Sequence, residues 1–100
     1  MGAKKLEVFN AIERRYAELG FVVSAPARIV ILKYLLEQQV INGPLLLKVI
    51  PLNIKTINQH IKVLERTGLI SGFYVGKSYY WRLNEQCLDD LGKISWVFEN

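Results

Sequence analysis

The segment NIKTINQHIKVLERTG, residues 53–68, has the pattern of an amphipathic helix. Ile57, Ile61 and Leu64 recur at the helical spacing, so one face of the segment is apolar. The asparagine at its start is a favourable N-cap, because its side-chain oxygen can accept a free backbone N–H of the first turn. The glycine at its end readily takes a left-handed conformation, which stops a helix. The sequence therefore predicts a helix over 53–68.

The opposite face of this helix carries lysines, amides and a hydroxyl. A helix face that is merely solvated usually mixes glutamate with lysine, because the two pair along the helix. Here the one acid, Glu65, comes late. Amides and short polar groups read the edges of DNA bases, and lysines contact phosphates, so this face is a candidate for DNA reading. Its residues are Lys55, Thr56, Asn58, Gln59 and Lys62.

A β-hairpin is predicted directly after the helix. The segment LISGFYVGKSYYWRL, residues 69–83, alternates and is rich in β-branched and aromatic residues, with a turn at about 75–78. Gly76 supplies backbone freedom at the turn, and Lys77 places a cation at the tip. A polar helix joined to a hairpin with a basic tip has the form of a winged helix.

At this point the chain resembles the ArsR-type winged helix–turn–helix repressors. Their pattern is a Thr-Val-Ser-x-His-Leu-x-x-Leu helix, a Gly-Leu-Val exit and a Gly-Arg…Tyr-x-Leu wing. TINQHIKVLERTGLI (56–70) and GKSYYWRL (76–83) match it, with Asn58 in place of the usual serine. SAPARIVILKYLL (24–36) matches the family's Ser-x-Pro-x-Arg-x-x-Ile-Leu segment. The resemblance covers about residues 24–83.

The resemblance implies a mainly α chain with a small β-hairpin, an α+β winged helix–turn–helix. One hundred residues make one domain. Within it we expect an N-terminal dimerisation helix (1–22), a winged-helix core (24–83) and a C-terminal dimerisation helix (84–100). In this family pattern Arg28 is a structural or backbone-contacting arginine rather than a base reader.

The other boundaries follow from local signals. Ser24 and Pro26 are expected to open a central helix, as its cap and its first-turn residue. A short helix over about 44–50 and a turn at 51–53 lead into the helix 53–68. This order predicts a helix–turn–helix.

Two amphipathic helices are predicted at the ends of the chain. The first runs from about Lys4 to Leu19, and the last from about Glu85 to Phe98 with Asn84 as its cap. In ArsR-type proteins the end helices form a two-fold dimer interface, which the resemblance implies here. The alternative is that they only cover the core of the monomer. The interface residues expected are Leu6, Phe9, Ile12, Tyr16, Leu88, Leu91, Ile94, Trp96 and Phe98.

Positive charge is concentrated in the middle of the chain, whose net charge is +4. Residues 43–82 carry six cations against Glu65 alone, whereas residues 83–100 carry one cation against four acids. Such a patch is expected of a phosphate-facing surface, and ordinary surface lysines are the alternative. The cations assigned to the DNA backbone are Lys62, Arg66 and Lys77.

Several classes of chemistry are disfavoured by composition. One cysteine forms no internal disulfide, which fits a reducing cytoplasm, and one cysteine with one histidine cannot assemble a metal site in a subunit. Where metal-sensing relatives carry thiols, this chain has Leu47 and Val49. We expect no metal and no cofactor. No nucleophile with a histidine base and no phosphate-binding glycine loop is present, so we expect no enzyme. No segment is apolar enough to span a membrane.

Three features leave two interpretations open. His60 either contacts DNA or is a hydrogen-bonded structural residue, since it borders the apolar stripe. Cys87 is either a small buried residue or a redox reporter across a dimer axis. The hairpin aromatics either pack the wing against the core or stack on bases of a single strand. These aromatics are Tyr74, Tyr79, Tyr80 and Trp81.

The sequence thus predicts a cytoplasmic, homodimeric repressor that binds a pseudo-palindromic double-stranded DNA operator. Its candidate DNA-binding residues are Lys55, Thr56, Asn58, Gln59, His60, Lys62, Arg66 and Lys77. Two alternatives remain at this level: a winged-helix module that binds a protein partner, and a regulator that responds to redox state or to a small molecule.

Overall fold

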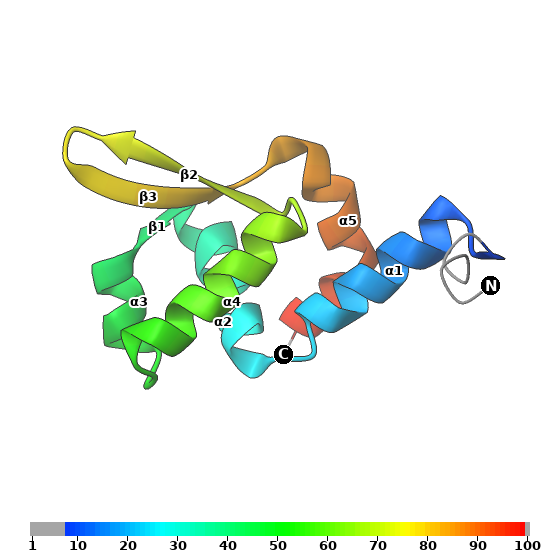
Figure 1. Cartoon of the computed structure of the whole chain (residues 1–100), viewed down its shortest axis with the longest axis horizontal. Coiled ribbons are helices and arrows are strands. Elements are labelled where there is room, and N and C mark those ends of the chain that lie inside the picture. Colours follow the sequence, from blue (N-terminus) through cyan, green and yellow to red (C-terminus); the bar gives the residue numbers. More distant parts are fainter. Residues whose placement is uncertain (1–7, 100) are drawn as a thin grey trace.

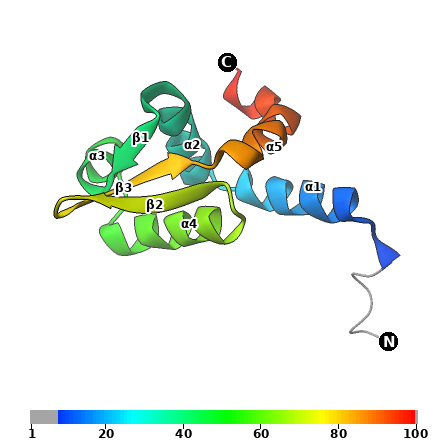
Figure 2. The same ribbon diagram turned by 90° about the horizontal axis from the view of Figure 1, so that it is seen from above.

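The computed structural model describes residues 8–99, which form a helical domain with one small antiparallel sheet (Figure 1). The expected α+β winged helix class is confirmed. The sheet lies across the helices α2 to α4, and α1 projects away from them at the end opposite the wing tip (Figures 1 and 2). The elements are α1 (Ala11–Val22), α2 (Pro26–Gln38), β1 (Val40–Asn42), α3 (Gly43–Val49), α4 (Ile54–Arg66), β2 (Ile70–Val75), β3 (Ser78–Leu83), η2 (Glu85–Cys87), α5 (Leu88–Lys93) and η3 (Ser95–Phe98).

The helix–turn–helix is formed by α3 and α4, and side-chain caps fix where each helix begins. The Asn42 side chain accepts the N–H of Leu45 at 2.9 Å, and the Asn53 side chain accepts that of Thr56 at 2.9 Å. Helix α4 ends before Gly68, whose φ of 81° is in the left-handed region. The predicted start and stop of this helix are therefore confirmed.

The wing is the antiparallel pair β2–β3, as predicted. Val75 pairs with Ser78 across a turn in which Gly76 has a φ of 61°, where glycine avoids the steric cost of a side chain. A third strand, β1, was not predicted. It pairs with β3 on the side away from β2 and joins the wing to α2 and α3.

The core is built around α2. Ile31, Leu32 and Leu35 are at most 1% exposed and pack with the buried residues of α4. Burying one such side chain stabilises the fold by roughly 1.5–3 kcal/mol, so this cluster fixes how α4 lies against α2. No single helix within residues 8–99 is long and apolar enough to cross a membrane; α1 and α2, bent by 99°, reach the required length and composition only as a pair.

The predicted start of the first helix is wrong. Residues 8–10 are not α-helical, and α1 begins at Ala11; residues 4–7 lie outside the described part. Asn10 and Glu13 form a capping box, in which the side chain of each accepts the backbone N–H of the other at 2.8 and 3.0 Å. This reciprocal pair fixes the start of the helix more strongly than the apolar period predicted. The helix also continues past Gly20 to Val22.

The predicted cap of the central helix is also wrong. Pro26 occupies the first turn of α2 as expected, but the cap position is Ala25, without a side-chain hydrogen bond. The Ser24 hydroxyl instead donates to the carbonyl of Phe21 at 2.6 Å. Ser24 therefore closes α1 rather than opening α2.

The last helix is broken, whereas the sequence predicted a continuous one. It consists of η2, α5 and η3, and the Asn84 side chain does not cap it. Asn84 instead donates to the carbonyl of Gly68 at 2.7 Å and accepts the hydroxyl of Ser71 at 2.7 Å. Gly92 and the β-branched and aromatic residues after Lys93 are weak helix formers, which agrees with the break.

Replacing Gly68 with alanine should lower the free energy of unfolding by about 1–2 kcal/mol, because alanine is strained in the left-handed conformation after α4. Gly20→Ala is the matched control. Gly20 is an exposed helical residue with open space where the methyl group of an alanine would lie, so its replacement should stabilise by about 0.5–1 kcal/mol. Urea unfolding followed by circular dichroism measures both. Equal effects would contradict the strain at Gly68.

Candidate nucleic-acid interface

Helix α4 is buried on one side and exposed on the other. Ile57, Ile61 and Leu64 are at most 3% exposed and face the core. The polar residues between them follow the helical repeat on the opposite side, where side chains three and four positions apart are neighbours. Lys55, Asn58, Gln59, Lys62 and Arg66 are exposed, and Thr56 is partly buried at the edge. The six side chains predicted here are thus accessible together, and their role as DNA contacts stays a prediction.

The cations of α4 and the wing are not neutralised by acids in the described part of the chain. The ion pairs among residues 8–99 involve only α1 and α5 side chains. They join Arg15 to Glu18 and Asp90, and Lys93 to Asp90. The described ion pairs thus lie on the end helices, whereas the cations of α4 and the wing are left for an outside anion.

The wing places a cation and two tyrosines beyond the core. Lys77 is exposed in the turn. Tyr74 is 72% exposed and packs edge-to-face on Tyr79, with the ring centroids 4.7 Å apart. Trp81 packs on the core, as expected for a wing aromatic, but Tyr74 does not. The Tyr79 ring lies over Gly72, where any larger residue would collide with it.

His60 has a defined structural partner, so one of its two interpretations is supported. Its Nδ1 lies 3.0 Å from the NH1 nitrogen of Arg28. Burial lowers the pKa of His60, and the positive charge of Arg28 lowers it further. Arg28 is 5% exposed, which fits the structural one of the two roles expected of it.

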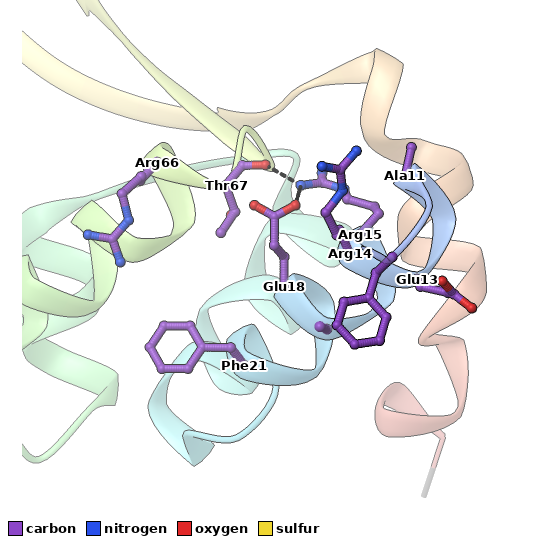
Figure 3. Close-up of a pocket in the computed structure, with 10 residues that line it drawn as sticks. Ala11, Glu13, Arg14, Arg15, Glu18, Phe21, Arg66 and Thr67 are labelled. Carbon is purple, nitrogen blue, oxygen red and sulfur yellow. Dashed lines mark hydrogen bonds and ion pairs between the residues drawn. The ribbon is translucent and has the colours of Figure 1, made fainter. Parts of the chain in front are cut away.

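A second arginine, Arg15 of α1, contacts the residue that follows the last turn of α4 (Figure 3) and also binds α5. The Arg15 guanidinium donates to the Asp90 carboxylate at 3.0 and 2.8 Å and to the carbonyl of Thr67 at 2.7 Å. Cys87 is 6% exposed, and its thiol donates to the carbonyl of Gly68 at 3.0 Å. The interpretation of Cys87 as a buried residue fits this position. Sequence reasoning missed the whole junction, because Arg15 and Asp90 are 75 residues apart.

A groove of about 1070 Å³ lies between α1 and the last turn of α4 (Figure 3). Its floor is mostly apolar, and its rim carries charged side chains. The lining residues are Phe9, Ala11, Glu13, Arg14, Arg15, Ala17, Glu18, Phe21, Arg66 and Thr67. No group of three or more His, Cys, Asp or Glu side chains within residues 8–99 is arranged to hold a metal ion.

The residues expected at a dimer interface divide into two sets. Leu91 and Ile94 are 5% and 4% exposed and belong to the core of the chain itself, which leaves little of either for a second subunit. Phe98 packs partly against the same core, and Leu6 lies outside the described residues. The exposed members are Phe9, Ile12, Tyr16, Leu88 and Trp96.

Comparison with known proteins identifies the fold and the family. No family model matches the chain, and no curated protein matches it. Among solved structures it is similar to HlyU from Vibrio cholerae N16961, with 16% identity and a TM-score of 0.73 over 90% of this chain and 98% of that one. It is also similar to the transcriptional repressor BigR from Xylella fastidiosa, with 26% identity and a TM-score of 0.64 over 83% and 91%.

A possible transcriptional regulator for arsenical resistance has 30% identity and a TM-score of 0.63, over 81% of this chain and 82% of that one. Fold and exposed surface together define a winged helix protein. The chain belongs to the ArsR-type family of winged helix transcriptional regulators.

Replacing Asp90 with asparagine should lower the free energy of unfolding at pH 7 by about 1–3 kcal/mol, because Arg15 loses a charged partner that is only 15% exposed. The hydrogen bonds from Arg15 hold the pKa of Asp90 below its ordinary value. The stabilisation is therefore complete above about pH 4 and is lost as the pH falls through the lowered pKa. Urea unfolding from pH 7 downward should show the variant and the wild type converging in acid.

The matched control is Asp89→Asn, because the neighbouring Asp89 is exposed and forms no hydrogen bond or ion pair with another described residue. This control should change the stability at pH 7 by less than about 0.5 kcal/mol. A loss equal to that of Asp90→Asn would assign the effect to helix charge rather than to the Arg15 junction.

Proposed function

We propose that this chain is a repressor that binds a pseudo-palindromic double-stranded DNA operator as a homodimer. The observation that carries the proposal is the exposed face of α4, where amides and cations stand beside a wing with a lysine at its tip. A winged helix reads DNA by placing such a helix in the major groove. Repression is inferred from the similarity to ArsR-type repressors.

The side chains of α4 divide into two roles by chemistry. Amides and hydroxyls form directional hydrogen bonds to base edges, so Thr56, Asn58 and Gln59 are assigned to base reading, with Lys55 beside them. Cations gain from neutralising phosphates whatever the sequence. Lys62, Arg66 and Lys77 are therefore assigned to the DNA backbone.

The dimer is proposed to form mainly through α1. Its outer side exposes Ile12 at 64% and Tyr16 at 48%, and Phe9 just before the helix is 51% exposed. Leu88 and Trp96, near the other end of the chain, are exposed as well and are assigned to the same interface. Leu91 and Ile94 are left out, because the monomer itself buries them. Two copies related by a two-fold axis would place two reading helices about one turn of DNA apart, at roughly 34 Å.

The regulator is proposed to work in the cytoplasm, and without a bound metal or cofactor. One cysteine and one histidine per chain are too few for the metal sites of ArsR-type sensors. Cys87 is assigned no sensing role, because its thiol is buried.

Gln59→Ala and Lys77→Ala should weaken DNA binding in different ways. Without the Gln59 amide, the preference for the operator over a mismatched duplex should fall by about 1–3 kcal/mol. Without the wing cation, all duplexes should bind more weakly, and the slope of log affinity against log salt should become shallower by about one. Fluorescence anisotropy at several salt concentrations, on a duplex selected from a random pool, measures both effects.

Lys93→Ala is the control for loss of a cation, because Lys93 lies on α5 at the end of the molecule away from the wing (Figure 1). It should leave the salt slope unchanged. If the wild type binds no duplex even at low salt, the surface serves a protein partner instead. A Lys77→Ala protein that loses only operator affinity would contradict the assignment of the wing to the backbone.

Ile12→Glu should convert a dimer into a monomer, because a buried carboxylate without a partner is costly in an apolar interface. Light scattering should give about twice the subunit mass of 11.5 kDa for the wild type and about one subunit mass for the variant. Val75→Glu is the matched control, since Val75 is 60% exposed but lies at the wing tip. A wild-type monomer, or a dimer that survives Ile12→Glu, would exclude α1 as the interface.

A further inference from the structure

His60 lies where α4 meets the first turn of α2, and its two ring nitrogens have different surroundings. Nδ1 is 3.0 Å from the NH1 nitrogen of Arg28. The guanidinium plane of Arg28 cannot adjust freely, because its Nε donates to the carbonyl of Val22 at 2.8 Å and its NH2 group donates to that of Phe21 at 2.7 Å. The guanidinium also lies over the Phe21 ring, 4.9 Å from its centroid. The partner of His60 is thus fixed in place.

This contact determines where the imidazole carries its proton. A guanidinium has five N–H donors and no acceptor, and it is not deprotonated in proteins. Because Arg28 can only donate, Nδ1 of His60 must accept, and it must therefore be unprotonated. A neutral imidazole has one N–H, which then lies on Nε2.

Nε2 is open to an outside acceptor. It forms no hydrogen bond with another described residue. A buried Nε2 without a partner would be an unsatisfied buried nitrogen, and among residues 8–99 the one such side-chain atom is Nε1 of Trp81. Nε2 therefore reaches the surface. His60 lies one helical turn after Thr56 and directly after Gln59, on the flank of the exposed face of α4.

We propose that Arg28 is a positioning residue for DNA binding, which holds His60 as a neutral imidazole and directs its Nε2–H toward an acceptor of the bound duplex. This inference rests on the proposed function and adds to it a residue that touches no DNA. It also connects the end of α1, through the carbonyls of Phe21 and Val22, to the reading helix.

The electrostatics of the site agree with this arrangement. A polyanion such as DNA attracts protons, so a free imidazole beside it would become a cation near its ordinary pKa of about 6.5. Burial and the charge of Arg28 both lower the pKa of His60, and Arg28 is the one described charged group that shifts it. The chain 21–24, which contacts the same guanidinium, contains no charged residue. His60 should therefore contribute a directional hydrogen bond rather than a charge.

Two near-isosteric replacements separate the ring nitrogens. In His60→Asn the side-chain oxygen can replace Nδ1 as the acceptor for Arg28, but nothing replaces Nε2. In His60→Gln the amide N–H can replace Nε2, but the acceptor for Arg28 is lost. We expect operator affinity about tenfold weaker for His60→Asn, which lacks the N–H, and about three- to tenfold weaker for His60→Gln, whose N–H is no longer held in place by Arg28, both with the wild-type salt slope. In urea unfolding, His60→Gln should lower the free energy of unfolding more than His60→Asn does, because His60→Gln loses the acceptor for Arg28.

Nitrogen NMR of the free full-length protein tests the proton position without DNA. The His60 ring should show an unprotonated Nδ1 and a protonated Nε2, and it should stay neutral down to below about pH 6.5. In Arg28→Met the pKa should rise toward its ordinary value, and DNA affinity should increase by about three- to tenfold between about pH 7.5 and 6, unlike wild type. The His60 variants and the wild-type spectrum keep the test valid if Arg28→Met does not fold.

The outcomes distinguish this inference from the proposed function. A proton on Nδ1, or a cationic His60 at pH 7, would overturn the role of Arg28 whatever the DNA results. Equal operator affinity of His60→Asn and wild type would overturn the contact through Nε2, while salt-dependent binding by the wild type would leave the proposed function intact. A wild type that binds no duplex at low salt would overturn both.

Discussion

Ile57, Ile61 and Leu64 are buried on one side of α4, and this burial determines what the other side presents. The three side chains pack with the apolar residues of α2, so rotation of α4 about its axis would expose them and bury lysines and amides. Either change costs several kcal/mol. The apolar contact, not the polar residues themselves, therefore orients the surface to which a function is assigned.

Both halves of α4 are also fixed by contacts from outside the helix–turn–helix. Arg28 of α2 binds His60 of α4, and it also binds two carbonyl groups at the end of α1. Arg15 binds the carbonyl of Thr67, just after the helix, and Asp90 of α5. The two arginines are charged groups with several donors each, so each can connect three segments at once. A dimer that involves α1 would thus be rigidly connected to the reading helices.

The parts of the fold that local signals specify were predictable, and the parts set by distant contacts were not. The period of α4, its cap Asn53 and the glycine turn of the wing are each specified by residues that lie close together in the sequence. Strand β1 has only three residues and exists because β3 is beside it. The side chain of Asn84 contacts Gly68 instead of capping, which no local pattern indicates. Among the candidate site residues, the exposed ones follow from periodicity, whereas the contact of His60 with Arg28 joins two helices 32 residues apart in the chain.

The two ends of the molecule differ in whether their cations are paired with acids, and this difference favours separate roles. At the α1–α5 end, Arg15 and Lys93 pair with Asp90, and several apolar and aromatic side chains are exposed nearby in the chain. At the helix–wing end, the described cations have no acidic partner. A surface of the first kind gains by contact with another apolar surface, and one of the second kind gains by contact with a polyanion. Because Leu91 and Ile94 at the α5 end are buried in the monomer's own core, the apolar surface falls mainly on α1, which is the helix that Arg28 and Arg15 connect to α4.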